Sequence, residues 1–179
     1  MNELFLKLKG EVEKAKVDLL KGNSGKNAEP PETVSQVKTD TERNYKLFVN
    51  EAIGGSDTKG LVIFAEAVAQ CLFAGRVTTN QLRNIFGYVK KIEAIDMQNT
   101  GALSQTLNEK SFAQLVMLPA KLAYLSGRAD NKQQKETLSL LKSIFDEAVE
   151  SVGNDRKRFR NFLNFFEAIV SYFRYYNPK

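Results

Sequence analysis

The sequence predicts an all-α fold, a single-domain compact helical bundle of about five to seven helices. Apolar residues recur at the helical spacing of three and four along most of the chain, and no strand-period alternation of useful length occurs. A length of 179 residues favours one domain, and 42% hydrophobic with 26% charged residues is typical of a globular protein. We expect an N-terminal helix over 1–21, a flexible linker over 22–42 and a helical-bundle core over 43–179.

The N-terminal segments differ in their apolar pattern. The first has a narrow seam at steps of three and four residues, typical of a coiled-coil-like helix, which Gly22 ends. Its members are Phe5, Leu8, Val12, Ala15 and Leu19. Residues 22–42 contain Pro30 and Pro31 and few apolar side chains, which predicts a linker without regular structure.

The first half of the core is predicted from helix stops and starts. A short helix over 43–53 ends at Gly54-Gly55, and a buried helix over 59–74 ends at Gly75. Thr78 and Gln81 have the spacing of a capping box, so the next helix begins at about Thr79. Its core stripe is Leu82, Ile85, Phe86, Val89 and Ile92.

The second half of the core contains three further helical stretches. One runs from Leu103 to Ser126, where Pro119 is expected to kink or divide it. The next carries apolar residues over 138–152 and closes at Gly153. The last has a wide apolar stripe over 159–173, which predicts packing into a core. The short connections favour antiparallel neighbours.

Composition argues against catalysis by this chain. Histidine is absent, which removes the commonest general base and metal ligand, and the lone Cys71 can form neither an internal disulfide nor a zinc cluster. Phosphate-loop, dinucleotide-binding and nucleophile-elbow motifs are also missing. We therefore expect no enzyme, no cofactor, no metal and no small-molecule substrate, and read Cys71 as a buried packing residue.

The location is predicted from two segments. Charged residues interrupt the first ten residues, unlike a signal peptide, and the nearly uncharged stretch 61–75 is shorter than the roughly 20 residues that span a bilayer. We expect a soluble, cytoplasmic protein without a membrane partner.

The positive charge is concentrated near the end of the chain. The net charge is +5, and the sequence pI is about 9.2. Residues 1–60 carry ten basic and ten acidic side chains, whereas residues 155–179 carry six and two, with eight aromatics. Such a segment suits nucleic acid, a membrane or another helix, and charge alone does not choose among them.

One row of cations accompanies the predicted helix that starts near Thr79. Arg76, Arg83 and Lys90 stand seven residues apart, and Lys91 flanks them. Cations that rise about 10 Å per heptad could follow a phosphate backbone. The alternative is an ordinary solvated helix face.

Two further groups of cations allow two interpretations each. Lys121 and Arg128 enclose Tyr124, so that the ring could stack a base beside phosphates, or belong to the core with cations at its rim. Arg160 lies with three other cations in the first turn of the last helix, where the helix dipole disfavours positive charge. That placement indicates a functional demand or nearby acidic partners.

Three blocks in order resemble a known family. They read VTTNQLRNIF over 77–86, LPAKLAYLSGR over 118–128 and FLNFFEAIVSY over 162–172. Together they resemble the small subunit of the type III-A CRISPR effector, the Csm complex. The resemblance covers roughly 59–176, and residues 1–58 match only loosely.

The resemblance implies an all-helical subunit of a prokaryotic ribonucleoprotein that has no nuclease activity of its own. In such complexes several copies stack as an inner filament along the duplex of crRNA and target RNA. The filament lies beside backbone subunits and a large polymerase-like subunit. The motif-matched Arg83, Lys121 and Arg128 are then expected to contact the RNA phosphate backbone.

Charge placement alone adds four candidate contacts, which the motifs do not cover: Arg76, Lys90, Lys91 and Arg160. Gln81, Glu167 and Tyr124 are interpreted as structural, as a helix cap, a helix-packing contact and a ring at the core edge.

A helical adaptor with protein partners only is the alternative function. It would use the seam over 5–19 and the tyrosines near the C-terminus as docking surfaces. It predicts assembly that survives nuclease digestion and negligible affinity for bare RNA.

Overall fold

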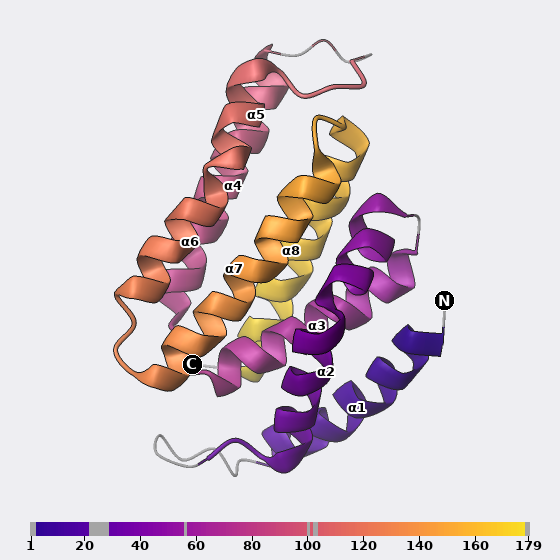
Figure 1. Cartoon of the computed structure of the whole chain (residues 1–179), viewed down its shortest axis with the longest axis vertical. Coiled ribbons are helices and arrows are strands. Elements are labelled where there is room, and N and C mark those ends of the chain that lie inside the picture. Colours follow the sequence, from indigo (N-terminus) through magenta and orange to yellow (C-terminus); the bar gives the residue numbers. More distant parts are fainter. Residues whose placement is uncertain (1–2, 22–28, 56, 100, 102–103, 178–179) are drawn as a thin grey trace.

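The computed structural model describes residues 3–21, 29–55, 57–99, 101 and 104–177. Its helices confirm the all-α prediction (Figure 1). They are α1 (Glu3–Leu20), α2 (Glu32–Val49), a π-helical turn η1 (Asn50–Gly54), α3 (Thr58–Ala74), α4 (Thr79–Asn99), α5 (Glu109–Val116), α6 (Leu118–Gly127), α7 (Lys132–Val152) and α8 (Arg156–Tyr176).

The helices form two groups around α3, α7 and α8 (Figure 1). On one side α1 and α2 pack against each other and against α3, and on the other α4, α5 and α6 pack together. Helix α3 lies in the middle and contacts α1, α2, α7 and α8. Its sequence is apolar on most sides, as a central helix requires.

Aromatic rings join the two groups. Phe5, Phe48, Phe64 and Phe165 form a continuous chain of rings from α1 through α2 and α3 to α8, with each successive centroid pair 5.1 Å apart. Such pairs contribute about 0.5–1.5 kcal/mol each beyond their area burial. A second cluster joins α4, α7 and α8 through Phe86, Phe145, Phe162 and Phe166.

The predicted linker over 22–42 is wrong in its second half. Residues 22–28 lie outside the described residues, but α2 begins at Glu32, directly after Pro31. Val34 and Val37 are buried, and the polar Thr41 continues the same stripe one turn later. Because a polar residue takes this core position, the apolar periodicity of the helix is too short to be seen in the sequence.

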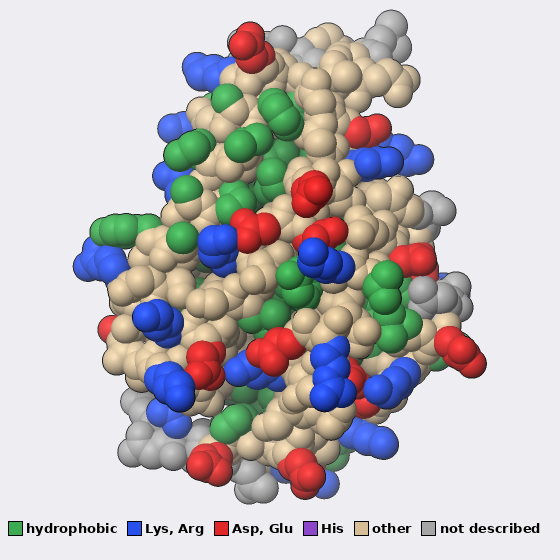
Figure 2. All heavy atoms as spheres, viewed as in Figure 1, with side chains coloured by type: hydrophobic (Ala, Val, Ile, Leu, Met, Phe, Trp, Pro, Cys, Tyr) green, Lys and Arg blue, Asp and Glu red, His purple; other side chains and the backbone are tan. Residues whose placement is uncertain are grey.

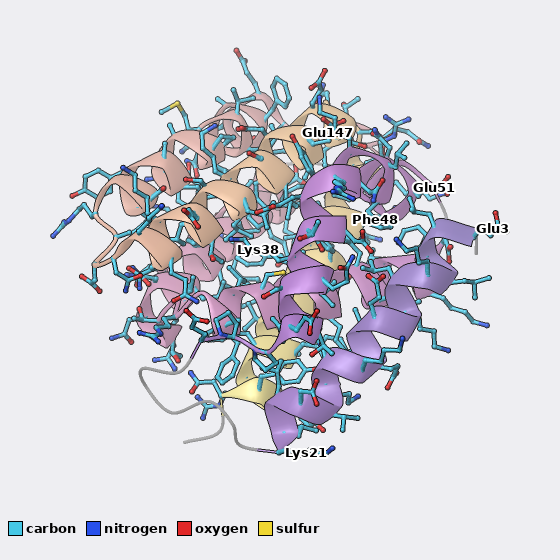
Figure 3. The ribbon with its side chains drawn as sticks, turned by 60° about the horizontal axis from the view of Figure 1, so that its bottom comes forward. Glu3, Lys21, Lys38, Phe48, Glu51 and Glu147 are labelled. Carbon is cyan, nitrogen blue, oxygen red and sulfur yellow. The ribbon has the colours of Figure 1, made fainter. Side chains whose placement is uncertain are left out.

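Two ion pairs join α2 to α7. Lys38 Nζ lies 3.6 Å from a carboxylate oxygen of Glu136, and Lys46 Nζ lies 3.7 Å from one of Glu147. Figure 3 labels Lys38 and Glu147, which lie at two separate points along the contact between α2 and α7. Helix α2 is thus part of the packed bundle.

Helix ends follow the predicted signals. The backbone N–H of Thr78 donates to Gln81 Oε1 at 2.8 Å, and the N–H of Gln81 donates to Thr78 Oγ1 at 3.2 Å, so the capping box forms and α4 starts at Thr79. Gly75 ends α3 where a Cβ would collide with the side chain of Thr137, so α3 and α7 approach closely only with glycine there. Gly153 ends α7 with a φ of 52°.

The helix predicted from Leu103 starts six residues later. Asn108 caps α5 by accepting from the N–H of Ser111 at 2.9 Å. Just before it, the chain runs beside the start of α8, where the N–H of Leu107 donates to the Asn154 carbonyl at 3.1 Å. Pro119 divides the remainder as predicted, because α5 ends at Val116 and α6 begins at Leu118.

A buried polar network anchors α1 and the end of α8 to α3. The Tyr176 hydroxyl donates to Glu66 Oε1 at 2.7 Å and accepts from Gln70 Nε2 at 3.0 Å. Gln70 Nε2 also donates to the Val12 carbonyl, and Lys16 Nζ lies 3.5 Å from Glu66. These contacts join α1, α3 and α8 through polar groups inside the bundle.

Cys71 is buried on α3, as predicted, and burial raises the pKa of its thiol to about 12. Among the described residues, no helix combines the length and the apolar character needed to cross a membrane.

Candidate nucleic-acid interface

Acidic side chains are missing from two segments that pack against each other. Residues 67–92 contain four Lys or Arg and no Asp or Glu, and residues 110–129 contain three and none. The first segment includes most of α4, and the second includes most of α5 and all of α6. The exposed surface of 76–92 and 110–128 is called the α4–α6 face below. Cations there meet few carboxylates of their own chain.

A groove of about 610 Å³ runs between α4 and α6. Most of its wall is apolar, with Tyr88 and Ile85 on α4 and Leu118, Tyr124 and Leu125 on α6. Figure 2 shows hydrophobic side chains gathered over α5 and α6, with Lys and Arg along the outer edge. The groove thus combines an apolar wall with a basic rim.

Lys121 lies at this rim and reaches across from α6 to α4. Its Nζ is 4.4 Å from the ring centroid of Tyr88, a cation–π contact. Tyr88 is held in place because its hydroxyl donates to the Gln114 carbonyl of α5 at 2.9 Å. Burial raises the pKa of Tyr88, so this hydroxyl stays protonated. One tyrosine therefore ties three helices together beneath an exposed ammonium.

Arg128 and Tyr124 form a second pair of a cation and a ring. Arg128 Nη1 donates to the Tyr124 hydroxyl at 2.8 Å, and its guanidinium carbon lies 5.5 Å from the ring centroid. Tyr124 is 62% exposed, so its interpretation as a ring at the core edge is wrong. The core face of α6 is formed by Leu118, Leu122 and Ser126, which leaves Tyr124 on the opposite side.

The predicted cations on α4 lie in unequal settings. Arg83 and Lys91 are exposed and have no ion-pair partner among the described residues. Arg76 is exposed in the turn before α4, with a φ of 58°, and its carbonyl accepts from Gln134 Nε2 at 2.8 Å.

The positive charge of Lys90 is balanced by two carboxylates. Its Nζ lies 2.5 Å from an oxygen of Glu93 and 3.0 Å from one of Glu167 on α8, and hydrogen bonds to both raise its pKa. Glu167 is thus a contact between helices, as predicted, through an ion pair. In the row of Arg76, Arg83 and Lys90, the last cation is therefore paired with carboxylates of its own chain.

Arg160 lies away from the groove, in a small crevice between α8 and the second half of α4. Glu93 and Asp96 line the same crevice, and Arg156 Nε donates to buried Asp96 at 2.8 Å. Acidic partners therefore offset part of the positive charge in the first turn of α8, the second of the two explanations drawn from the sequence.

Sequence reasoning missed Tyr88 and Asn84, which both line the groove from α4. Their spacing of four residues places them on one helix face, but nothing in the sequence shows that α6 lies opposite. The contact between Lys121 and Tyr88 joins residues 33 positions apart, which only the folded chain reveals.

These features define a class of protein, a small all-α bundle with a basic, aromatic face and no group of three or more metal-ligating side chains among the described residues. The family model described as Csm2 Type III-A matches residues 55–179, and the chain belongs to this family. Comparison with curated proteins and with solved structures returns no match.

Proposed function

We propose that the chain is a non-catalytic, RNA-binding small subunit of a type III-A CRISPR ribonucleoprotein in the cytoplasm of a prokaryote. In this role several copies stack as an inner filament that lines the duplex of crRNA and target RNA in antiviral defence. Its neighbours are the backbone subunits and the large polymerase-like subunit. The observation that carries the proposal is the family match, which includes the whole α4–α6 face.

Arg83, Lys121 and Arg128 are the proposed contacts to RNA phosphates. All three are exposed, and carboxylates of the described chain form ion pairs with none of them. Contacts to phosphate carry no base information, which suits a subunit that must accept any guide sequence. Arg76 and Lys91 extend the same surface, whereas Lys90 and Arg160 have acidic neighbours and are weaker candidates.

Several features support a role without catalysis. The chain has no histidine, and its one cysteine is buried with its pKa raised to about 12, so the thiol is neither exposed nor ionised near neutral pH. Of the residues that the structure describes, those lining the groove are apolar residues, two tyrosines, Asn84 and Lys121, with no carboxylate among them. A general base is therefore lacking at the site where RNA is proposed to bind.

A protein-only adaptor is the second candidate. The seam over 5–19 is buried within the chain itself and is not available to a partner. What favours an adaptor is the outer side of α1, where Leu6, Val17 and Leu20 are each about half exposed. These residues suit a contact with another protein, with or without RNA in the assembly.

The deciding experiment is an affinity purification of the tagged chain from its native host, with sequencing of RNA and identification of proteins. We expect short RNAs with CRISPR repeat tags, a backbone subunit and a large polymerase-like subunit. Nuclease treatment of the same sample then tests whether RNA is needed for the assembly. Protein partners without such RNA would favour the adaptor and overturn the proposal.

A further inference from the structure

Tyr124 is unusual among the aromatic residues because it is 62% exposed and yet held in place. The guanidinium of Arg128 fixes it through a hydrogen bond to the hydroxyl and a contact with the ring. The ring lines the groove between α4 and α6. An oriented aromatic ring at the wall of an open apolar groove is suited to stacking a flat ligand.

The rim of the groove selects for negative charge on that ligand. Lys121 lines the groove, and Arg128 donates a hydrogen bond to Tyr124 in its wall. No carboxylate occurs among the described residues that line the groove. Asn84 adds an amide that can both donate and accept hydrogen bonds. A ligand that combines a flat ring, polar edges and an adjacent negative charge has the chemistry of a nucleotide.

We propose that the groove between α4 and α6 is a stacking site for one unpaired nucleobase of single-stranded RNA. Tyr124 provides the stacking ring, Asn84 faces the edge of the base, and Lys121 and Arg128 hold the flanking phosphates. This inference rests on the proposed function and names the ligand of the same surface.

An unpaired base that is splayed out of an RNA strand fits the groove better than a paired base or a protein helix. Bases within a duplex are already stacked on their neighbours, and only splayed bases reach an aromatic side chain. An apolar protein helix would cover Lys121 and Arg128 without supplying anions, which is costly for charged groups that lose water. A groove volume of about 610 Å³ lies within the range of small-molecule sites, so a single base can enter it.

The test uses the full-length chain and a single-stranded oligouridylate that contains one 2-aminopurine, whose fluorescence falls when it stacks. We expect quenching with the unaltered chain. Tyr124→Ala should lose the quenching and weaken binding by about 5- to 150-fold, the range for loss of one base stack. Tyr124→Phe keeps the ring but loses the hydrogen bond from Arg128, so it should retain most of the quenching and bind more tightly than Tyr124→Ala.

Salt dependence separates the base site from the phosphate contacts. Tyr124→Ala removes no charge, so the slope of log affinity against log salt should match that of the unaltered chain, whereas Lys121→Ala should lower it by about 0.7. Unchanged affinity and quenching in Tyr124→Ala would overturn the base site and leave RNA binding by the subunit standing.

Two other results would also overturn the base site. One is the absence of quenching with the unaltered chain. The other is a loss of self-association by Tyr124→Ala in sedimentation with RNA binding unchanged, which would assign the groove to a protein contact. The proposed function is decided separately, by the RNA that co-purifies with the tagged chain.

Discussion

The α1–α2 region and the α4–α6 face carry cations in opposite settings. On α1 and α2, Lys7 pairs with Asp40, Lys16 with Glu66, and Lys38 with Glu136, so their charge is used within the fold. On the α4–α6 face, Lys121 and Arg128 lie against tyrosine rings instead of carboxylates. A ring leaves the positive charge unneutralised, so it stays available to a polyanion.

Aromatic residues also lie in opposite settings, and substituting them gives the largest expected effect, a change in the free energy of unfolding. Phe64 is fully buried between two other rings, whereas Tyr124 is mostly exposed. Phe64→Ala should lower the free energy of unfolding by about 3–5 kcal/mol, because a cavity replaces a packed ring. Tyr124→Ala should lower it by less than about 1 kcal/mol.

Urea unfolding followed by circular dichroism measures both variants against the unaltered chain. A large loss of stability in Tyr124→Ala would show that the ring supports the fold, and the contrast between the two residues would fail.

Charge reversal on the α4–α6 face is expected to have the next largest effect. The combination of Arg83→Glu, Lys121→Glu and Arg128→Glu should weaken target-RNA binding by the assembled complex about 100-fold or more. Three phosphate contacts are lost and three repulsive charges are gained. Filter binding at several salt concentrations measures the affinity and its salt slope.

A control with the same change in net charge lies outside this face. Lys9, Lys21 and Lys59 are exposed on α1, just after α1, and on α3, and replacing all three by Glu should change RNA affinity by only a few fold. Equal losses in the two triple variants would mean that net charge, rather than the α4–α6 face, determines RNA binding.

The contact between α1 and α2 should depend on pH. Burial and a hydrogen bond with Asp40 raise the pKa of Glu11 from 4.5 to about 7, against the opposing charges of Lys7 and Lys14. The folded chain therefore keeps a proton that the unfolded chain loses above about 4.5. The contribution of Glu11 to stability is fully present below about pH 4.5 and declines as the pH rises towards about 7, whereas the lowered pKa of Asp40 matters only at lower pH.

Urea unfolding at intervals between pH 4.5 and 7.5 tests this dependence. Glu11→Gln should remove most of the decline, because the amide has the shape of the protonated acid and does not ionise. Glu13→Gln, on the exposed side of the same helix, should leave the decline in place. An identical pH profile for Glu11→Gln and the unaltered chain would rule out this residue as the cause.

Much of the fold could be predicted from local signals, because these act within one helix. The buried seam of α1, the capping box at Thr78 and the glycine ends at 75 and 153 all depend on neighbours along the chain. The part of α2 over 32–42 is not predicted from the sequence, because Asp40 and Thr41 fill buried positions where an apolar residue would show the period. Asp40 pairs with Lys7 of α1, and the sequence does not show that these two helices lie together.

The candidate site could be predicted only in part for the same reason. Arg83, Lys121 and Arg128 stand out by charge and by motif, but their state depends on tertiary neighbours. The prediction that Tyr124 lies at the core edge is wrong, although Leu118 and Leu122 already define the buried side of its helix in the sequence. By spacing alone Lys90 is equivalent to Arg83, and only the packing of α8 brings Glu167 to it.

Lys90 and Arg83 therefore offer the finest comparison, because they share a helix, a charge and nearly a face. Lys90 is held by Glu93 and Glu167, whereas Arg83 has no ion-pair partner among the described residues. Arg83→Ala should lower the salt slope of RNA binding by about 0.7 to 0.9, and Lys90→Ala by much less, because a paired lysine must first lose its carboxylates. Each substitution should change stability by less than about 1 kcal/mol, since Arg83 is exposed and Lys90 is half-exposed.

The single substitution Glu167→Gln, with Lys90 and Arg83 unchanged, tests why these two cations differ. With one carboxylate removed, Lys90 gains freedom to bind phosphate, so the affinity of this variant for RNA should rise slightly and its salt slope should steepen. Equal slopes for Arg83→Ala and Lys90→Ala would show that pairing within the chain does not decide which cations bind RNA. In that case the position of a cation along the α4–α6 face, rather than the absence of a carboxylate beside it, would govern binding.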